Sequence, residues 1–277
     1  MAKINIMING LPGNVAKKMT GFAINDDRFN VVPVSLTGQE IEEKTITIDQ
    51  TIFELVRPDT RDDKIDTIKT QFSSFIAIDY THPAAVNSNA LFYTQNHIPF
   101  VMGTTGGDRE QLEQVVKNSS TPAVIAPNMA KQIVGFQAMM EYAANTFPGL
   151  FKGYTLEVKE SHQNGKADTS GTAKAMVTYF NKLGSDFDAN DIQMIRDPEI
   201  QEKVWKIPKK YLTGHGWHTY TLKASDGSAL FEFKHNINGR DIYVNGTFDA
   251  VLFLKEKLGQ PDNSQKLYTM IDVLNKD

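Results

Sequence analysis

The sequence contains no cysteine. A chain without cysteine forms no disulfide frame, and it offers no thiolate to a metal ion or as a catalytic nucleophile. This composition fits a reducing compartment. We therefore expect a cytoplasmic protein, and we expect no bound metal.

Excess positive charge is absent as well, because the formal net charge is -4 at pH 7. Proteins that bind nucleic acid or anionic membranes through their charge carry a basic patch, and the sequence shows no such patch. We therefore expect neither nucleic acid nor a membrane as a partner.

Long hydrophobic runs are also missing. No run approaches the roughly 18 apolar residues that a membrane-spanning helix requires. The N-terminal segment alternates apolar side chains at Ile4, Ile6 and Ile8 and lacks the long hydrophobic stretch of a signal peptide. It predicts a first strand in a soluble protein.

The 277 residues are 40% hydrophobic and 22% charged, as in ordinary globular proteins, and this length accommodates two domains or one large α/β domain. In the first part, a helix pattern at residues 15–24 follows the first strand, and helical patterns separate several later strands. Because parallel strands need such crossovers, this part predicts a Rossmann-type, doubly wound parallel sheet. The expected strands lie at residues 4–8, 31–36, 46–48, 74–79, 99–103 and 123–126.

After Pro127 the pattern changes to a helix at residues 131–145 and then to β-rich segments with turn dipeptides between them. This predicts a second, α+β domain with a mixed or antiparallel sheet. Helices expected at 247–258 and 266–274 could return to the first domain. We expect a dinucleotide-binding domain of residues 1–129 and about 246–277, and a substrate-binding and oligomerisation domain of about 130–245. The expected strands of the second sheet lie at residues 156–160, 218–224, 229–236 and 241–247.

The turn N-G-L-P-G-N-V-A, residues 9–16, follows the first strand and opens a helix, where free N–H groups favour a pyrophosphate. Gly10 and Gly13 would let the backbone approach phosphate closely. The spacing departs from G-x-G-x-x-G, because Ala16 takes the third small position. The segment is therefore either a pyrophosphate cradle or a structural turn.

Three further loops follow expected strands. S-L-T-G-Q, residues 35–39, lacks the acidic residue that binds a ribose 2'-hydroxyl, and Ser35 and Thr37 could bind a 2'-phosphate instead, or be ordinary turn hydroxyls. This favours NADPH, with NADH as the alternative. In D-Y-T-H-P (79–83) and M-G-T-T-G-G (102–107), Thr81 and the glycines and threonines could hold the nicotinamide end, or form plain turns.

The densest group of reactive residues is E-S-H-Q-N-G-K-A-D-T-S-G-T-A-K-A, residues 160–175. It places His162 and Lys166 ahead of T-S-G-T, which opens a helix. Hydroxyls and amides at a helix N-terminus with a nearby lysine suit a carboxylate, and histidine or lysine can donate a proton. Alternatively, Thr169 or Ser170 caps the helix, and His162 and Lys166 lie on a solvated loop.

This stretch resembles the dihydrodipicolinate reductase family, whose pattern is E-x-H-H-x-x-K-x-D-x-x-S-G-T-A. Gln163 stands where most bacterial members have a second histidine, as in the plant-type branch, which leaves the role of that position open. Motifs N-G-x-x-G, D-Y-T-H-P, G-T-T-G-G, A-P-N-M-A-K-Q (126–132) and F-K-H-N-I-N-G-R (233–240) follow in the family's order. Apart from one residue fewer between Asp168 and Ser170, the pattern matches at Glu160, His162, Lys166, Asp168, Ser170, Gly171, Thr172 and Ala173.

The resemblance implies a Rossmann-type cofactor domain built from both chain ends, a mixed-sheet domain and a homotetramer. It also implies reduction of dihydrodipicolinate, formed from 4-hydroxy-tetrahydrodipicolinate, to tetrahydrodipicolinate by NADPH or NADH in lysine biosynthesis through diaminopimelate. Position by position, His162 would be the catalytic proton donor and Lys166 a second donor or carboxylate ligand. Gln163, Ser170, Gly171 and Thr172 would bind the substrate.

The cofactor roles that the resemblance implies fall on three segments: a pyrophosphate cradle, a nicotinamide loop and a hinge. His218, His235 and Arg240 are weaker candidates, because strand histidines and turn arginines commonly satisfy local carbonyls or carboxylates. The cofactor residues are Gly10, Pro12, Gly13, Asn14 and Val15 at the cradle, Gly103, Thr104 and Thr105 at the nicotinamide, and Asn128 and Met129 at the hinge.

Two other functions remain open. Another Rossmann dehydrogenase of an amino-acid pathway would leave residues 160–173 unexplained. A non-catalytic nicotinamide-binding regulator would not need His162, Lys166 and S-G-T together.

Overall fold

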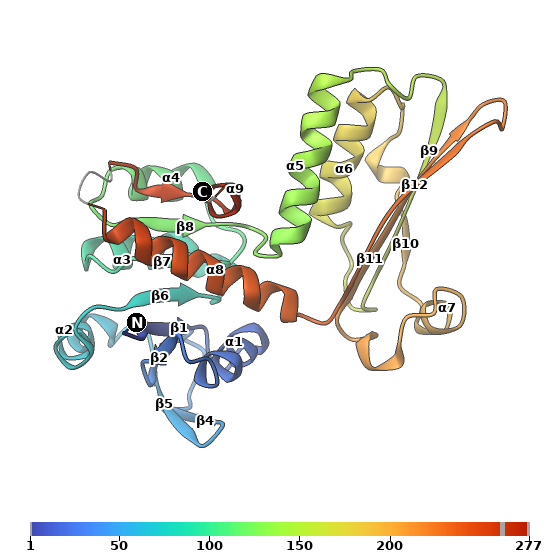
Figure 1. Cartoon of the computed structure of the whole chain (residues 1–277). Coiled ribbons are helices and arrows are strands. Elements are labelled where there is room, and N and C mark those ends of the chain that lie inside the picture. Colours follow the sequence, from blue (N-terminus) through green and yellow to red (C-terminus); the bar gives the residue numbers. More distant parts are fainter. Residues whose placement is uncertain (1, 261–263, 276–277) are drawn as a thin grey trace. The chain divides into compact units, whose positions relative to one another are not determined.

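The computed structural model describes residues 2–260 and 264–275 and divides the chain into two compact units. The first unit consists of Met1–Lys131 and Tyr243–Asp277, and the second of Gln132–Ile242. Figure 1 shows a parallel sheet flanked by helices in the first unit, and a sheet with two long helices on one face in the second.

The main sheet of the first unit has the strand order β13-β8-β7-β6-β1-β2, and every neighbouring pair is parallel. Its central strands β6 and β7 are buried along their whole length, as expected for a sheet covered on both faces. The predicted Rossmann-type parallel sheet is confirmed. Its strands are β1 (Ile4–Asn9), β2 (Phe29–Val31), β6 (Ile76–Asp79), β7 (Phe100–Met102), β8 (Ala123–Ile125) and β13 (Leu267–Tyr268).

The chain order reverses at β1, which pairs with β2 on one side and β6 on the other. In open α/β sheets, ligands bind beyond the carboxyl ends of the strands at such a switch point. The helices of this unit are α1 (Asn14–Ile24), α2 (Arg61–Phe72), α3 (Val86–Gln95), α4 (Arg109–Lys117), α8 (Asp241–Leu258, which starts at the unit boundary) and α9 (Met270–Leu274), with a 3-10 turn at Pro83–Ala85.

A small second sheet, which the sequence did not predict, contains β3 (Val34–Leu36), β4 (Thr45–Ile48) and β5 (Thr51–Val56). The expected strand at 31–36 is therefore two strands in two sheets. Pro33 lies between them and has no N–H to continue a ladder. Residues 46–48 form a strand as expected, but that strand belongs to the small sheet.

The sheet of the second unit has the order β10-β9-β11-β12, with β10 parallel to β9 and the other pairs antiparallel. The predicted mixed sheet is confirmed. The elements of this part are α5 (Lys131–Thr146), β9 (Tyr154–His162), α6 (Gly171–Lys182), β10 (Gln193–Ile195), α7 (Pro198–Lys203), β11 (His215–Ala224) and β12 (Leu230–Asn238), with 3-10 turns at Ala189–Asp191 and Lys209–Tyr211.

Strand pairing places an apolar core and a polar cluster on the same face of this sheet. Val158 pairs with Tyr220, and both belong to the core that includes residues of α5 and α6. Because side chains alternate between faces, Glu160, two residues after Val158, shares that face with its partner His218. His218 in turn pairs with His235 on β12. The polar cluster therefore continues the core toward one end of the sheet.

Two predictions for the C-terminal part were wrong. The strand expected at 241–247 is the start of helix α8, in which Val244, Phe248 and Val251 are buried at helical spacing. The helix expected at 266–274 is interrupted, because Leu267–Tyr268 form strand β13 beside β8. Only Met270–Leu274 is helical, and it begins at a capping box.

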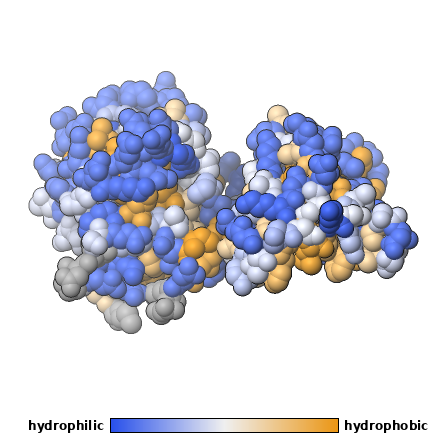
Figure 2. Space-filling model, turned by 90° about the horizontal axis from the view of Figure 1, so that it is seen from above, coloured by the Kyte–Doolittle hydropathy of each residue, from blue (hydrophilic) through white to orange (hydrophobic). Residues whose placement is uncertain are grey.

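No helix in the described part of the chain is long and apolar enough to cross a membrane. Figure 2 shows a face that is largely hydrophilic, with hydrophobic residues gathered in separate patches.

Candidate functional site

The turn after β1 packs so closely against the chain's own backbone that its two glycines have no room for side chains. Gly10 has a φ of +106°, and a Cβ added there would lie 2.1 Å from the carbonyl oxygen of Tyr80. A Cβ on Gly13 would lie 2.7 Å from the oxygen of Gly10. Helix α1 begins directly after Gly13 without a side-chain cap. Its first N–H groups therefore remain available to an anion.

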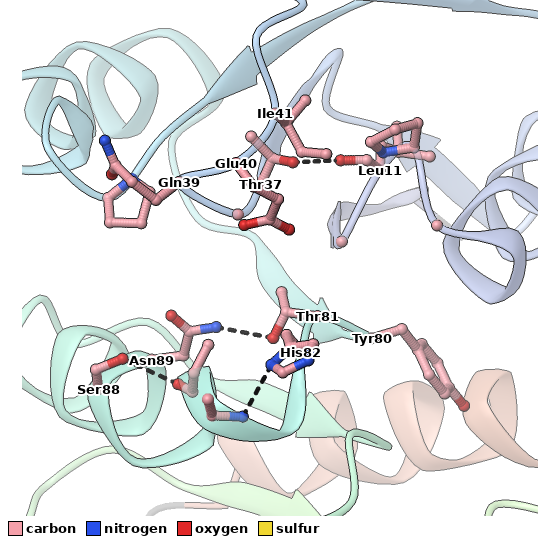
Figure 3. A pocket seen from close by; sticks show the side chains of 17 residues that line it. Leu11, Thr37, Gln39, Glu40, Ile41, Tyr80, Thr81, His82, Ser88 and Asn89 are labelled. Carbon is pink, nitrogen blue, oxygen red and sulfur yellow. Dashed lines mark hydrogen bonds between the residues drawn. The ribbon is translucent and has the colours of Figure 1, made fainter.

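A cavity of about 530 Å³ opens beside this turn, at the carboxyl ends of the strands. Figure 3 shows Leu11 and residues of the loop after β3 on one side of the cavity, and residues of the loop after β6 and of α3 on the other. Five of the predicted cofactor residues line it: Gly10, Pro12, Gly13, Thr37 and Thr81. Lining residues that the sequence prediction missed include Gln39, Glu40, His82, Ser88 and Asn89.

The hydroxyls predicted to bind a 2'-phosphate make hydrogen bonds to the glycine turn. Ser35 is fully buried, accepts a hydrogen bond from the N–H of Leu11 (3.2 Å) and donates to the oxygen of Leu36 (3.3 Å). Thr37 donates to the oxygen of Leu11 at 2.6 Å. Both side chains therefore support the turn, and their contact with a 2'-phosphate stays a prediction.

The buried carboxylate of Asp79 joins the two predicted nicotinamide loops. It accepts hydrogen bonds from the hydroxyls of Thr81 (2.8 Å), Thr104 (2.5 Å) and Tyr93 (2.7 Å), and from the amide of Asn89 (3.0 Å). Burial and the neighbouring Asp79 raise the pKa of Tyr93 well above its usual value. The sequence reasoning named Thr81 and Thr104 but missed the carboxylate that positions them.

The remaining cofactor candidates do not line this cavity. Gly103 has no room for a side chain, because a Cβ there would lie 2.5 Å from the ring of Tyr80, and Thr105 is exposed. Asn128 accepts from the N–H of Ala130, and the oxygen of Met129 lies where a Cβ of Gly246 would be. Asn14 and Val15 begin helix α1.

In the second unit, Glu160 and His162 of β9, His218 of β11 and His235 of β12 form one cluster, called here the histidine cluster. The Nε2 atoms of His162 and His218 are 3.1 Å apart, and Nδ1 of His218 lies 3.2 Å from Nε2 of His235. Oε2 of Glu160 lies 3.6 Å from Nε2 of His218. The structure thus joins the weaker candidates His218 and His235 to the predicted catalytic histidine.

The hydrogen bonds of the cluster indicate which ring nitrogens carry a hydrogen. Nδ1 of His162 lies 3.1 Å from the backbone oxygen of His215, which can only accept, so Nδ1 carries the hydrogen. In the neutral ring, Nε2 then accepts from His218. Burial, followed by the charge of His218, lowers the pKa of His162 to about 4, and the same two causes lower that of His235 to about 3. Both rings are neutral near pH 7.

Arg196, which the sequence reasoning missed, ties Glu160 to the loop after β9. Its Nη2 lies 2.5 Å from Oε1 of Glu160, and its Nε donates to the backbone oxygen of Lys166 at 2.8 Å. Burial alone would raise the pKa of Glu160, but hydrogen bonds from His218, Arg196 and the N–H of Ser170 lower it to about 2. No sequence signal marks Arg196, because the pairing of β10 with β9 brings it there.

The start of α6 keeps donors available, as an anion site requires. The N–H of Ser170 is used by Glu160 at 3.0 Å, but the side chain of Ser170 does not cap the helix. The alternative that Ser170 is only a cap is therefore not supported. Lys166 pairs with Asp168 at 2.7 Å, and Asp168 is exposed. Gln163 is half-buried, and its backbone oxygen accepts from the N–H of Lys166.

Comparison with known families covers almost the whole chain. The model described as the N-terminus of dihydrodipicolinate reductase matches residues 4–129, and that of the C-terminus matches residues 133–274. The chain belongs to the dihydrodipicolinate reductase family. The resemblance noted in the sequence is thereby confirmed, and with it the place of this chain among oxidoreductases.

Plant members of the dihydrodipicolinate reductase family are similar to this chain along its length. A probable 4-hydroxy-tetrahydrodipicolinate reductase 2, chloroplastic, of Oryza sativa subsp. japonica is 42% identical, with 98% of this chain and 83% of the rice protein covered. The 4-hydroxy-tetrahydrodipicolinate reductase 2, chloroplastic, of Arabidopsis thaliana is 43% identical, with 99% and 78% covered.

A solved structure of another protein shares the fold of this chain. Dipicolinate-bound dihydrodipicolinate reductase from Paenisporosarcina sp. TG-14 matches with a TM-score of 0.67 over 97% of this chain and 98% of that chain. The identity is 18%, so this likeness concerns the fold alone.

Proposed function

We propose that the chain reduces dihydrodipicolinate, formed from 4-hydroxy-tetrahydrodipicolinate, to tetrahydrodipicolinate with a reduced nicotinamide dinucleotide, in lysine biosynthesis through diaminopimelate. Family membership over both halves of the chain supports this activity. The observation that carries it is the segment after β9, where His162, Lys166 and the start of α6 stand together as the family pattern requires.

The turn after β1 fits a dinucleotide. A pyrophosphate needs bare backbone, and side chains are excluded at Gly10 and Gly13 by the clashes described above. We propose that Gly10, Pro12 and Gly13 hold the pyrophosphate and that Thr81, Gly103, Thr104 and Thr105 hold the nicotinamide end. When bound, the reduced nicotinamide supplies the hydride.

We propose NADPH as the hydride donor, with NADH accepted as well. The sequence favours NADPH because no acidic residue directly follows the expected second strand. Glu40, however, lines the cavity, and no lysine or arginine does so among the described lining residues. A carboxylate accepts hydrogen bonds from ribose hydroxyls and repels a 2'-phosphate. We therefore expect a weaker preference for NADPH over NADH than the sequence alone suggested.

The substrate is a dicarboxylate, and the second unit offers it donors and positive charge. We propose that the hydroxyl of Ser170 and the first N–H groups of α6, at Gly171 and Thr172, bind one carboxylate. Lys166 would leave the exposed Asp168 to pair with the substrate, and Gln163 would contribute an amide. Arg196 acts through the loop, because its hydrogen bond to the oxygen of Lys166 fixes where that side chain starts.

Reduction of one double bond consumes one hydride and one proton. The free enzyme holds His162 neutral, since burial lowers its pKa to about 4. A doubly negative substrate beside the ring would raise that pKa, so His162 becomes a proton donor only when the substrate is bound. Lys166 brings an ammonium proton to the same place. We propose that these two groups supply the proton.

NADPH oxidation tests the function directly when the substrate is made freshly by a synthase acting on aspartate semialdehyde and pyruvate. We expect rapid NADPH loss only when synthase, its substrates and this chain are all present. Loss of NADPH with aspartate semialdehyde alone would instead indicate another dehydrogenase. Cofactor binding without any turnover would indicate a non-catalytic nicotinamide-binding protein.

We also propose assembly into a homotetramer through the sheet of the second unit. Strand β12 is an edge of that sheet, and Leu230 and Phe231 on it are exposed. Open edges with apolar side chains favour association. Light scattering after gel filtration tests this, with four chains expected. The cytoplasmic location stays a prediction, because the two plant relatives are named as chloroplastic.

A further inference from the structure

Three side-chain atoms of the histidine cluster have the spacing of metal ligands. They are Nε2 of His162, Nε2 of His218 and Oε2 of Glu160, and their separations are 3.1, 3.6 and 4.0 Å. Around a tetrahedral Zn²⁺ with bonds of about 2.0 to 2.1 Å, ligand atoms lie roughly 3.3 to 3.4 Å apart. An ion could bind between the three atoms with shifts well below about 1 Å.

The surrounding hydrogen bonds orient all three ligands. A ligating histidine normally donates its other ring N–H to a carbonyl or carboxylate, and His162 does this toward the oxygen of His215 at 3.1 Å. The second oxygen of Glu160 is held by Arg196. His218 faces His235 through Nδ1 at 3.2 Å. This shell is in place without any movement of the strands.

Binding requires a ring proton to change position on both His218 and His235. In the free cluster, Nε2 of His218 donates to His162, so Nδ1 of a neutral His218 accepts from His235. As a ligand, His218 would carry the hydrogen on Nδ1 and donate it to His235, whose own hydrogen would move to its other ring nitrogen. The heavy atoms stay where they are. His162 already presents a lone pair at Nε2.

We propose that Glu160, His162 and His218 form a site for Zn²⁺ or a similar transition metal ion, and that its occupation inhibits the enzyme. Two imidazoles and one carboxylate suit such ions, whereas Mg²⁺ and Ca²⁺ prefer oxygen ligands throughout. In the described part of the chain, this is the one group of histidine and acidic residues with such spacing. Inhibition follows because the ion takes Nε2 of His162, the proposed proton donor, so this second part depends on the proposed function.

Zinc binding is tested first, without any turnover. Chelator-treated protein competes with a colorimetric zinc indicator, and we expect one tight Zn²⁺ per wild-type chain. His218→Gln should weaken binding at least about tenfold, by analogy with losses of 10- to 100-fold for changes around metal sites. His97→Asn is the matched control, because His97 lies outside the cluster and its φ of +53° is tolerated by asparagine. The control should bind zinc like wild type.

Co²⁺ provides a measurement on wild-type protein that does not depend on how a variant folds. A four-coordinate site gives the strong visible absorption of tetrahedral Co²⁺, and added Zn²⁺ should abolish it. The metal site is overturned if wild type binds no zinc, if His218→Gln and His97→Asn bind it equally, or if Co²⁺ shows only the weak spectrum of an octahedral ion.

Inhibition is then measured as NADPH oxidation at increasing Zn²⁺, with recovery on addition of EDTA. Loss of activity that parallels occupancy supports the proposal. Stoichiometric zinc binding with full activity overturns the inhibitory part. If the protein has no reductase activity at all, the proposed function fails, and the binding and Co²⁺ measurements still decide the metal site.

Discussion

The two units bind their proposed ligands with different parts of the chain. In the first unit, backbone left bare by Gly10 and Gly13 lines the cavity, and the buried Asp79 holds its loops. In the second unit, the proposed ligand meets charged and titratable side chains from separate strands. Strand pairing brings two of them, Glu160 and His218, together. On the proposed roles, cofactor binding depends on unobstructed backbone and the reduction depends on charge, so we expect that each can be changed separately.

The largest effect should come from removing the ammonium group of Lys166 in the second unit. Lys166→Ala should lower kcat by about 10²- to 10⁴-fold, the usual contribution of a positioned proton donor, and leave the Kd of NADPH unchanged. Steady-state kinetics and cofactor fluorescence measure the two quantities. His162→Ala should act in the same direction. Unchanged kcat in both variants would remove these residues from the mechanism.

A side chain added to the glycine turn should instead weaken cofactor binding in the first unit. Gly10→Ala puts a Cβ 2.1 Å from the oxygen of Tyr80 at a φ of +106°. The turn must shift, so the Kd of NADPH should rise by about 10²-fold, and stability should fall by roughly 1 to 3 kcal/mol for the strained backbone. Gly214→Ala is the control, because no atom lies within 4 Å of its added Cβ. Equal behaviour of the two variants would contradict a tight cradle.

Asp79 is an exception in the first unit, because a charged side chain there supports the cavity. Asp79→Asn introduces an NH₂ group among donors from Thr81, Thr104 and Tyr93, and at least one hydrogen bond must be lost. We expect a loss of about 1 to 3 kcal/mol in unfolding free energy and a weaker cofactor Kd. Urea unfolding and fluorescence titration measure these effects. A variant as stable as wild type would show that the network is dispensable.

The smallest effect concerns pH and the neutral histidines of the second unit. The pKa of His235 is lowered to about 3 in the folded protein, from about 6.5 when unfolded. The unfolded chain therefore binds more protons between these values, so this contribution to stability is complete above pH 6.5 and is lost as pH falls toward 3. Between pH 7 and pH 5, wild type should lose about 2 kcal/mol more than His235→Gln. Parallel pH curves from denaturant unfolding would contradict this.

The sequence predicted those parts of the molecule that depend on local pattern. Apolar patterns indicated most strands of both main sheets but neither β10 nor β13. The run from Glu160 to Ala173 indicated the family that the comparison confirms. The pattern failed where tertiary contacts decide the outcome. The β-branched and aromatic residues at 242–244 are compatible with a strand until the burial of Val244 with Phe248 and Val251 on one face of α8 is known.

Residues joined only by strand pairing could not be predicted as a group. Arg196 reaches Glu160 because β10 runs beside β9, and His235 reaches His218 because β12 pairs with β11. Glu40 and Asp79 were missed for a related reason. Glu40 lies in the loop after β3 and Asp79 is the last residue of β6, and the direction of each side chain depends on the final path of the chain there.

We propose that bare backbone of the first unit binds the cofactor and that charge in the second performs the reduction. Single-turnover reduction, with NADPH raised to saturation in every variant, separates these two roles. We expect Gly10→Ala to regain nearly the wild-type rate and Lys166→Ala to remain slow at every cofactor concentration. A Gly10→Ala rate that stays low at saturation, together with a Lys166→Ala rate rescued by more NADPH, would refute this division of roles.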